Sequence, residues 1–179
     1  HGSSGGLLTT AAWITESDQA SAYFGYSVST AGDVNGDGYS DVIVGANLYD
    51  NGQSNEGRAY VYHGSSGGLL TTAAWITESD LINAFFGVSV STAGDVNGDG
   101  YSDVIVGANQ YENGQTAEGR AFVYHGSASG LSTTAAWTAE SDQASAQFGF
   151  SVSTAGDVNS DGYSDVIVGA NLYDNGQTD

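Results

Sequence analysis

The chain has 179 residues, of which 40% are hydrophobic and 11% aromatic, so it has enough apolar material to fold around a packed core. Its 21 acidic residues against two basic ones exclude nucleic acids and anionic membrane surfaces as partners, because both kinds of binding depend on Lys and Arg. The sequence has no cysteine for a disulfide and no apolar run of the roughly 20 residues that span a bilayer, and its charge favours a cation as partner.

A repeat of 62 residues organises the whole chain. The segment HGSSGGLLTTAAWITESD starts at His1, recurs unchanged from His63 and returns as a near copy from His125. Because the chain opens at His1 rather than Met, it is expected to be a processed product, an excised fragment or an engineered piece. We expect one partial domain over 1–179, with repeats at 1–62, 63–124 and 125–179, the last one truncated.

Each repeat is expected to form four strands joined by turns of Gly, Ser, Asn and Asp. The first strand is expected over Phe24 to Ser29, with alternating large and small residues. The second, over Asp41 to Ala46, has an apolar centre typical of burial on both faces. The third covers Arg58 to Tyr62, and the fourth runs roughly from Ala73 to Thr77 around Trp75.

Short strands at a fixed spacing predict an all-β fold, a β-propeller with one four-stranded sheet per blade. The chain holds about three blades, an incomplete ring on its own. A β-solenoid is the less favoured alternative, because its repeats are usually far shorter. The three tryptophans, one per repeat, are expected in the core rather than on a sugar-binding platform.

The segment between the first two strands, DVNGDGYSD from Asp33 to Asp41, points to calcium. Oxygen-bearing side chains occupy its first, third, fifth and ninth positions, and calcium takes about 6–8 oxygen ligands. Gly38 stands at the sixth position, where a calcium loop turns sharply. By analogy with the EF-hand, the backbone carbonyl of Tyr39 is a further ligand and Asp41 a bidentate one. The loop is not an EF-hand, because strands flank it and Asp closes it at position nine.

A turn without metal is the alternative, since Asn-Gly and Asp-Gly are common in hairpins. Three carboxylates in nine residues repel one another unless they are neutralised, however, and the pattern occurs three times. We therefore predict about three Ca²⁺ ions per chain, magnesium being less suited because it keeps its waters. The predicted ligands are Asp33, Asn35, Asp37, Tyr39 and Asp41 in the first loop, Asp95, Asn97, Asp99, Tyr101 and Asp103 in the second, and Asp157, Asn159, Asp161, Tyr163 and Asp165 in the third.

Two glycine motifs flank each loop: Phe24-Gly25 precedes the first loop and Gly45-Ala46-Asn47 follows it. Their counterparts are Phe86-Gly87 with Gly107-Ala108-Asn109, and Phe148-Gly149 with Gly169-Ala170-Asn171. This order resembles the FG-GAP repeat of integrin α-subunit propellers over essentially the whole chain, with Asn in place of the family's Pro. The resemblance implies an extracellular, calcium-loaded propeller that serves adhesion or ligand binding. Because integrin propellers have seven blades, it also implies a partner for the open edges, either other copies of the chain or the rest of a longer propeller.

The turns of such a sheet lie at alternate ends, so the calcium loop and the HGSSGGL turn are expected to share one end. Differences between the repeats concentrate in the turns of the other end, either by drift in exposed loops or because those turns form a ligand surface. Candidate ligand contacts are Tyr49, Tyr111, Tyr173, Leu81 and Ile82.

No catalytic set of side chains is recognisable, since the chain lacks Cys and Lys and its calcium loops account for most carboxylate pairs. The leading interpretation is a non-enzymatic, secreted or cell-surface module for adhesion or structure, with an extracellular protein or glycan as ligand. The alternatives are a calcium-dependent, lectin-like propeller and a non-catalytic arm of a larger secreted enzyme.

Overall fold

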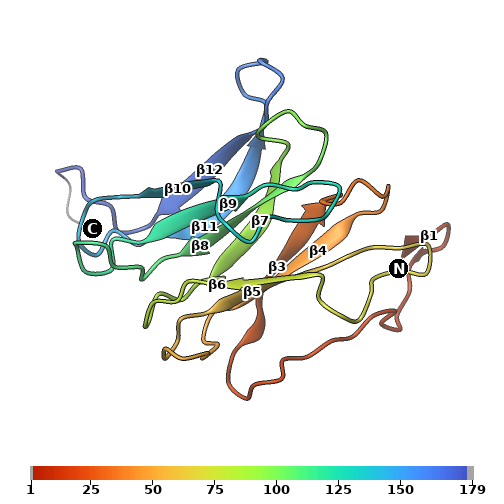
Figure 1. Cartoon of the computed structure of the whole chain (residues 1–179), viewed down its shortest axis with the longest axis horizontal. Helices are drawn as coiled ribbons and strands as arrows, with labels where there is room; N and C mark the ends of the chain where they lie inside the picture. The colour runs from red at the N-terminus through yellow and green to blue at the C-terminus, as the bar shows by residue number, and fades with distance from the viewer. Residues whose placement is uncertain (1, 177–179) are drawn as a thin grey trace.

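The computed structural model describes residues 2–176, which form strands and turns without any helix (Figure 1). Two four-stranded antiparallel sheets follow one another, in the orders β3-β4-β5-β6 and β7-β8-β9-β10, and β11-β12 form a further pair. We call them blade 1, blade 2 and blade 3. The strands are β1 (Gly2–Ser3), β2 (Gly6–Leu7), β3 (Phe24–Gly32), β4 (Asp41–Ala46), β5 (Arg58–Tyr62), β6 (Trp75–Glu78), β7 (Ser89–Gly94), β8 (Asp103–Ala108), β9 (Arg120–Tyr124), β10 (Trp137–Glu140), β11 (Phe148–Gly156) and β12 (Asp165–Ala170).

The all-β, incomplete propeller predicted from the repeat is confirmed. Within residues 2–176, no helix is long and apolar enough to cross a membrane. The innermost strands β3, β7 and β11 contact one another in turn, so the blades fan out around a common side (Figure 1).

Adjacent blades pack a face of small and branched side chains against a face of aromatic ones. In blade 1, Ile43 pairs with Val61 across β4 and β5, so both side chains lie on the same face. This face buries the rings of Phe86 and Phe122 of blade 2 in a shared hydrophobic cluster. The two rings meet edge to face with centroids 5.3 Å apart, an arrangement that adds to the energy of burial. The blades are thus held together by a continuous apolar layer.

The glycines of the two sequence motifs meet at each junction between blades. A Cβ atom on Gly45 would collide with the carbonyl oxygen of Gly87, and one on Gly87 would lie 2.7 Å from the carbonyl oxygen of Arg58. The close approach is fixed by the hydroxyl of Ser27, which donates to the Gly87 carbonyl at 2.7 Å. The FG of one repeat therefore packs on the GA of the repeat before it.

Strand boundaries agree closely with the sequence-based expectation, with two differences. β3 continues past Ser29 to Gly32, and β6 runs from Trp75 to Glu78 rather than roughly from Ala73 to Thr77. The expected alternation along β3 is interrupted between Phe24 and Ser27, where the register with β4 shifts. The backbone at Gly25 has a positive φ of 83° and forms a β-bulge, which a period-two pattern does not anticipate.

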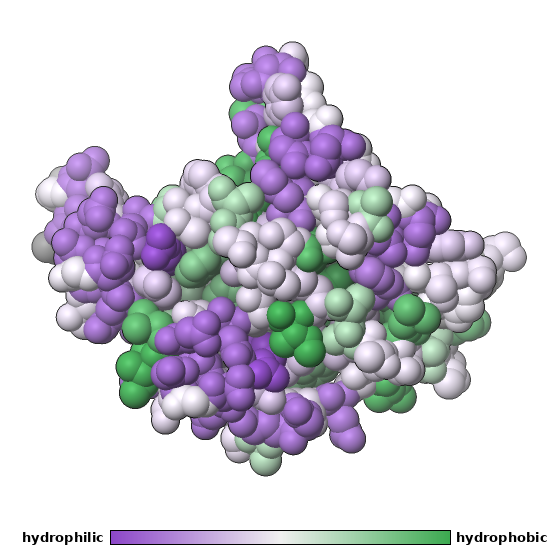
Figure 2. All heavy atoms as spheres, viewed as in Figure 1, coloured by the Kyte–Doolittle hydropathy of each residue, from purple (hydrophilic) through white to green (hydrophobic). Residues whose placement is uncertain are grey.

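The outer faces of the first and last blades remain open. The equivalent residues Ile43 and Ile105 are fully buried at the two internal junctions, whereas Ile167 of blade 3 is 60% exposed. On blade 1, the ring of Trp13 covers part of the open face by packing edge to face on Tyr62. Figure 2 shows small hydrophobic patches set among polar residues on one side of the molecule.

Candidate functional site

The three predicted calcium loops lie along one edge of the molecule, after β3, β7 and β11 (Figure 1, orange, green and blue). In the first loop the chain winds around the carboxylate of Asp33. Its Oδ1 accepts from the N–H groups of Gly36 at 2.8 Å and Asp37 at 3.1 Å. Its Oδ2 accepts from the N–H of Gly38 at 2.8 Å. The first residue of the motif thus sets the conformation of the next five.

The alternate side chains of the loop continue this winding. The amide oxygen of Asn35 accepts from the N–H of Asp37, and Asp37 Oδ1 accepts from the N–H of Tyr39 at 3.0 Å. The Asn35 amide also donates to Asp37 Oδ2 at 3.0 Å. The N–H of Tyr39, then the Asn35 amide and the charge of His63, lower the pKa of Asp37. The side chain is therefore a carboxylate at neutral pH.

Asp41, the ninth residue, is fully buried and has protein partners at both oxygens. Oδ2 accepts from the N–H of Val34 at 2.9 Å, and Oδ1 accepts from the N–H of Gly64 at 2.8 Å. Burial raises the pKa of Asp41 in spite of these two hydrogen bonds. Asp41 therefore ties the loop to the turn after β5, and these two turns share one end of the sheet as expected.

The donor chemistry of the loop fits a hard cation. Asp33, Asn35 and Asp37 offer carboxylate and amide oxygens at alternate positions, and an oxygen that accepts one N–H keeps a second lone pair. Within residues 2–176, however, the loop carboxylates do not form a group of three with oxygens within 4.8 Å. Asp41 in particular is engaged by backbone N–H groups, and its role as a ligand stays a prediction.

The second and third loops repeat this geometry. Asp95 accepts from the N–H of Gly100 and Asp157 from that of Gly162, at 2.8 and 2.9 Å. The pKa of Asp157 is lowered, chiefly by the hydrogen bond from the N–H of Gly162. Burial acts in the opposite sense, and further backbone N–H groups add to the lowering. Burial raises the pKa of Asp103, the counterpart of Asp41.

Neighbouring loops are in direct contact. The ring of Tyr101 lies against Gly36 of the preceding loop, where a Cβ atom would stand 2.6 Å from the ring. The N–H of Ser102 donates to the carbonyl oxygen of Asp33 at 3.0 Å. Tyr163 packs on Gly98 in the same way, but Ser160 occupies the equivalent position in the third loop. The loops thus form a connected row rather than three isolated turns.

At the opposite end of the blades lies an acidic group that the sequence analysis did not anticipate. One oxygen each from Glu56, Glu78 and Asp80 lie within 4.8 Å of one another. Burial raises the pKa of Glu56, and the charges of Glu78 and Asp80 act in the same direction. Glu118, Glu140 and Asp142 form the same group in blade 2. An available signal was the Glu-Gly-Arg whose Arg opens the third strand, because the antiparallel register pairs this Arg with the Glu that ends the fourth strand.

The five candidate ligand contacts differ in how far their side chains are exposed to solvent. Tyr49 is only 7% exposed, because the guanidinium of Arg58 lies 3.7 Å above its ring. Tyr173 and Ile82 are exposed, whereas Tyr111 and Leu81 are half-buried. The expectation that Tyr49 offers its ring at the surface therefore does not match its packing, and the ligand surface as a whole stays a prediction.

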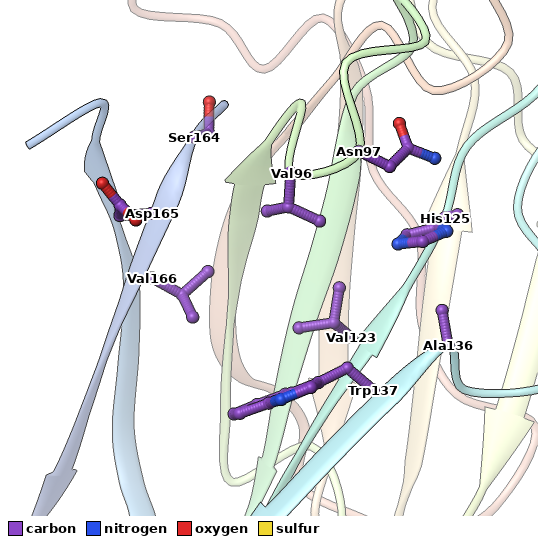
Figure 3. Close-up of a pocket in the computed structure, with 9 residues that line it drawn as sticks. All are labelled: Val96, Asn97, Val123, His125, Ala136, Trp137, Ser164, Asp165 and Val166. Carbon is purple, nitrogen blue, oxygen red and sulfur yellow. The ribbon is translucent and has the colours of Figure 1, made fainter. Parts of the chain in front are cut away.

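A hollow of about 460 Å³ opens between blades 2 and 3. Figure 3 shows the ring of Trp137 beneath Val123, with Val166 facing them from β12. At the preceding junction the equivalent Trp75 is covered by Tyr124, with ring centroids 5.0 Å apart. The hollow is thus the place that the third strand of a blade fills.

Comparison with known proteins places these features in a family. The FG-GAP repeat model matches residues 24–62, 86–124 and 148–179. The chain is 36% identical over 161 residues to integrin alpha-IIb of Mus musculus. It is 34% identical over 164 residues to integrin alpha-8 and over 162 residues to integrin alpha-V, both of Gallus gallus. These alignments cover 86% of this chain but only 15% of each relative.

Proposed function

Because this chain belongs to the FG-GAP repeat family, we propose that it is a calcium-binding part of a β-propeller that serves adhesion or a structural role and performs no catalysis. The observation that carries the proposal is the winding of each loop around its first Asp, with oxygen donors at alternate positions. Loops of this kind fit a hard cation and leave no assembled acid, base or nucleophile among their side chains.

In each loop, the first, third, fifth and ninth side chains and the seventh carbonyl would hold one Ca²⁺. The bound ion would neutralise carboxylates that otherwise repel. Asp33 sets the loop conformation before binding, and Asp41 links the loop to the turn at Gly64. The ion would therefore brace two turns of one blade in a chain without disulfides.

An extracellular location, secreted or at the cell surface, belongs to the same proposal. Calcium is held by extracellular modules with Kd values of about 10⁻⁴–10⁻³ M, which suits a loop that is largely open to solvent. An extracellular protein or glycan is then the expected ligand. The repeats 1–62, 63–124 and 125–179 are proposed as units of one propeller domain.

The proposed partner at the open end is a further repeat, either from another copy or from a longer propeller. The hollow at Trp137 supports this, since Tyr124 and Leu131 fill the equivalent place at the junction before it. A strand with the pattern of β9 would cover the apolar lining and pair with the free edge of β12.

Calcium titration of the chelator-treated chain tests the loop sites. Changing Asp37, Asp99 and Asp161 to Ala should remove three bound ions, one per loop. In melting curves, the same variant should lose most of the stabilisation that calcium adds, which is about 2.7 kcal/mol per site at a hundredfold excess over Kd.

The matched control is Glu112→Ala, an exposed acidic residue outside the loops that should leave the ion count unchanged. An unchanged ion count in the triple loop variant would show that the loops are plain turns and would refute the calcium assignment.

A further inference from the structure

The end of the blades away from the loops holds two acidic groups with the spacing of cation ligands. The first acidic group consists of Glu56 before β5, Glu78 at the end of β6 and Asp80 after it, and the second consists of Glu118, Glu140 and Asp142. In each group, one oxygen per residue lies within 4.8 Å of the other two. Two oxygens bound to one calcium at about 2.3–2.6 Å are at most about 5 Å apart, so this spacing fits a shared ion.

A buried oxygen without a partner lies in each group. The side chain of Glu56 is fully buried, and its Oε1 accepts from the N–H of Asn51. Its Oε2 has no hydrogen-bond donor among residues 2–176, and Glu118 repeats this arrangement with Asn113. A buried carboxylate oxygen without a donor is costly, so it calls for a proton or a cation.

The charge near the first group is only partly balanced. The guanidinium of Arg58 forms an ion pair with Glu78 Oε2 at 2.7 Å and also donates from Nε at 2.9 Å. This pairing compensates one of the three carboxylates and leaves Glu56 and Asp80 without a basic partner in the described chain. The residual negative charge favours a divalent ion over a monovalent one.

We propose that each acidic group binds one hard divalent cation of the calcium class, at sites separate from the Asp/Asn loops. The ligands are carboxylates, which such cations prefer, and calcium tolerates the irregular geometry of side chains from three different segments. The ion would join the turn before the third strand to the end of the fourth, next to the surface where the repeats differ in sequence.

The two acidic groups differ in the partner of their arginine, and this difference predicts which group binds calcium more tightly. Blade 2 carries Thr138 where blade 1 carries Ile76, and Arg120 donates to the hydroxyl of Thr138 at 2.8 Å. As a result, Arg120 Nε is 3.8 Å from Glu140 Oε2, which has no hydrogen-bond donor in the part of the chain that the structure describes. With less competition from the arginine, the second group should bind calcium more tightly than the first.

Counting the calcium ions bound to the full chain tests the proposal. Bound metal is first removed with a chelator, and the chain is then dialysed to equilibrium against calcium up to the millimolar range. We expect five ions per chain, three in the loops and two in the acidic groups. Changing both Glu56 and Glu118 to Gln should lower the count by two, because the shape is kept while the charge is lost. Glu112→Gln is the matched control and should not change the count.

The loop variant with Asp37, Asp99 and Asp161 changed to Ala separates this proposal from the proposed function. It should retain the two ions of the acidic groups, whatever the loops bind in the unaltered chain. A count that the Glu56→Gln and Glu118→Gln changes leave unaltered would overturn the proposal, even if the loops bind as expected.

A second test does not alter any proposed ligand. Thr138→Ile frees Arg120 to pair with Glu140, as Arg58 pairs with Glu78, and should weaken calcium binding at the second group by roughly fivefold. Ile76→Thr should have the opposite effect at the first group. Unchanged affinities in both variants would overturn the ranking of the two acidic groups by competition from the arginine.

Discussion

The junction between blades 2 and 3 depends on Gly107 having no side chain. A Cβ atom there would collide with the carbonyl oxygen of Gly149 and stand 2.5 Å from the Ser89 hydroxyl. Because a backbone carbonyl cannot move without shifting a strand, Gly107→Ala should lower the free energy of unfolding by about 3 kcal/mol. Urea unfolding measures this change.

Gly67→Ala is the matched control for this prediction. The nearest atom to a Cβ at Gly67 is the Ser65 hydroxyl at 3.7 Å, an ordinary contact distance. Its free energy of unfolding should stay within about 0.5 kcal/mol of the unaltered chain. Equal losses in the two variants would contradict the idea that the junction glycines are special.

The buried Tyr124 makes stability fall at alkaline pH. Burial raises the pKa of Tyr124 to about 12, against about 10 in the unfolded chain. Between these values the unfolded state loses the proton and the folded state keeps it. The free energy of unfolding should therefore decrease by up to about 1.4 kcal/mol per pH unit on account of this residue.

Urea unfolding at pH 9, 10 and 11 checks this slope. Tyr124→Phe should make the slope shallower, while burial also raises the pKa of Tyr60 to about 12 and leaves a remaining dependence. A slope that is the same in both proteins would show that Tyr124 ionises normally in the fold.

At the level of single residues, the sequence indicated the loops, whose calcium binding stays a prediction, but it did not indicate the acidic groups. The loop from Asp33 to Asp41 is a local motif, so its side chains are brought together by nine consecutive residues. Glu56 and Glu78 are far apart in sequence and meet only through the register of β5 with β6. The buried position of Tyr49 was missed for the same reason, since Tyr49 lies in the turn after β4 and the covering Arg58 belongs to β5.

At the level of elements, the tryptophan of the second repeat seals the gap between blades 1 and 2. Trp75 is only 5% exposed and its indole N–H donates to the carbonyl oxygen of Ser132 in the next repeat. Trp137 has the same place in its strand but is 43% exposed beside the hollow. The same residue type thus has two environments in one molecule.

Truncation to alanine should separate these two environments. Trp75→Ala should cost about 3–5 kcal/mol of unfolding free energy, the range for large buried side chains. Trp137→Ala should cost clearly less, because much of its ring is already in water. Thermal or urea unfolding of both variants provides the comparison, and equal costs would show that the hollow at Trp137 is closed in solution.

The strands themselves were largely predictable, and the reason is their uniform repeat. β4 and β5 have the expected boundaries, because their apolar centres are flanked by turn residues. β3 departs from expectation at Gly25, where a positive φ inserts a bulge. A bulge is set by the fit to the neighbouring strand, and a pattern of alternating residues does not contain that information.

On the scale of the whole molecule, the two end faces leave apolar side chains in water. Val28 of blade 1 is 65% exposed, whereas its counterpart Val90 is 7% exposed at an internal junction. Blade 3 similarly exposes Ile167, beside an edge of β12 that has no strand partner within residues 2–176. Open faces and free strand edges favour association with another chain.

Light scattering of the isolated chain should therefore find assemblies heavier than the 18.2 kDa monomer. A synthetic peptide with the sequence of residues 118–140 offers the missing strand and should shift the chain towards a smaller species. A scrambled peptide is the control. A folded, monodisperse monomer without any peptide would show that two junctions suffice for stability.

The contact between Tyr101 and Gly36 gives the row of blades a direction, because the tyrosine comes from the later of two neighbouring loops and the glycine from the earlier one. The first and second loops each receive the tyrosine of the next loop, at a glycine where a Cβ atom would stand less than 3 Å from the ring. The third loop has Ser160 at this position, with a φ of 61° like the glycines it replaces. A blade stacked after it must turn its tyrosine away or lack one. In a ring built from such repeats, the junction after the third loop would differ from the others. The blades would then be distinguishable by position despite their near-identical sequences.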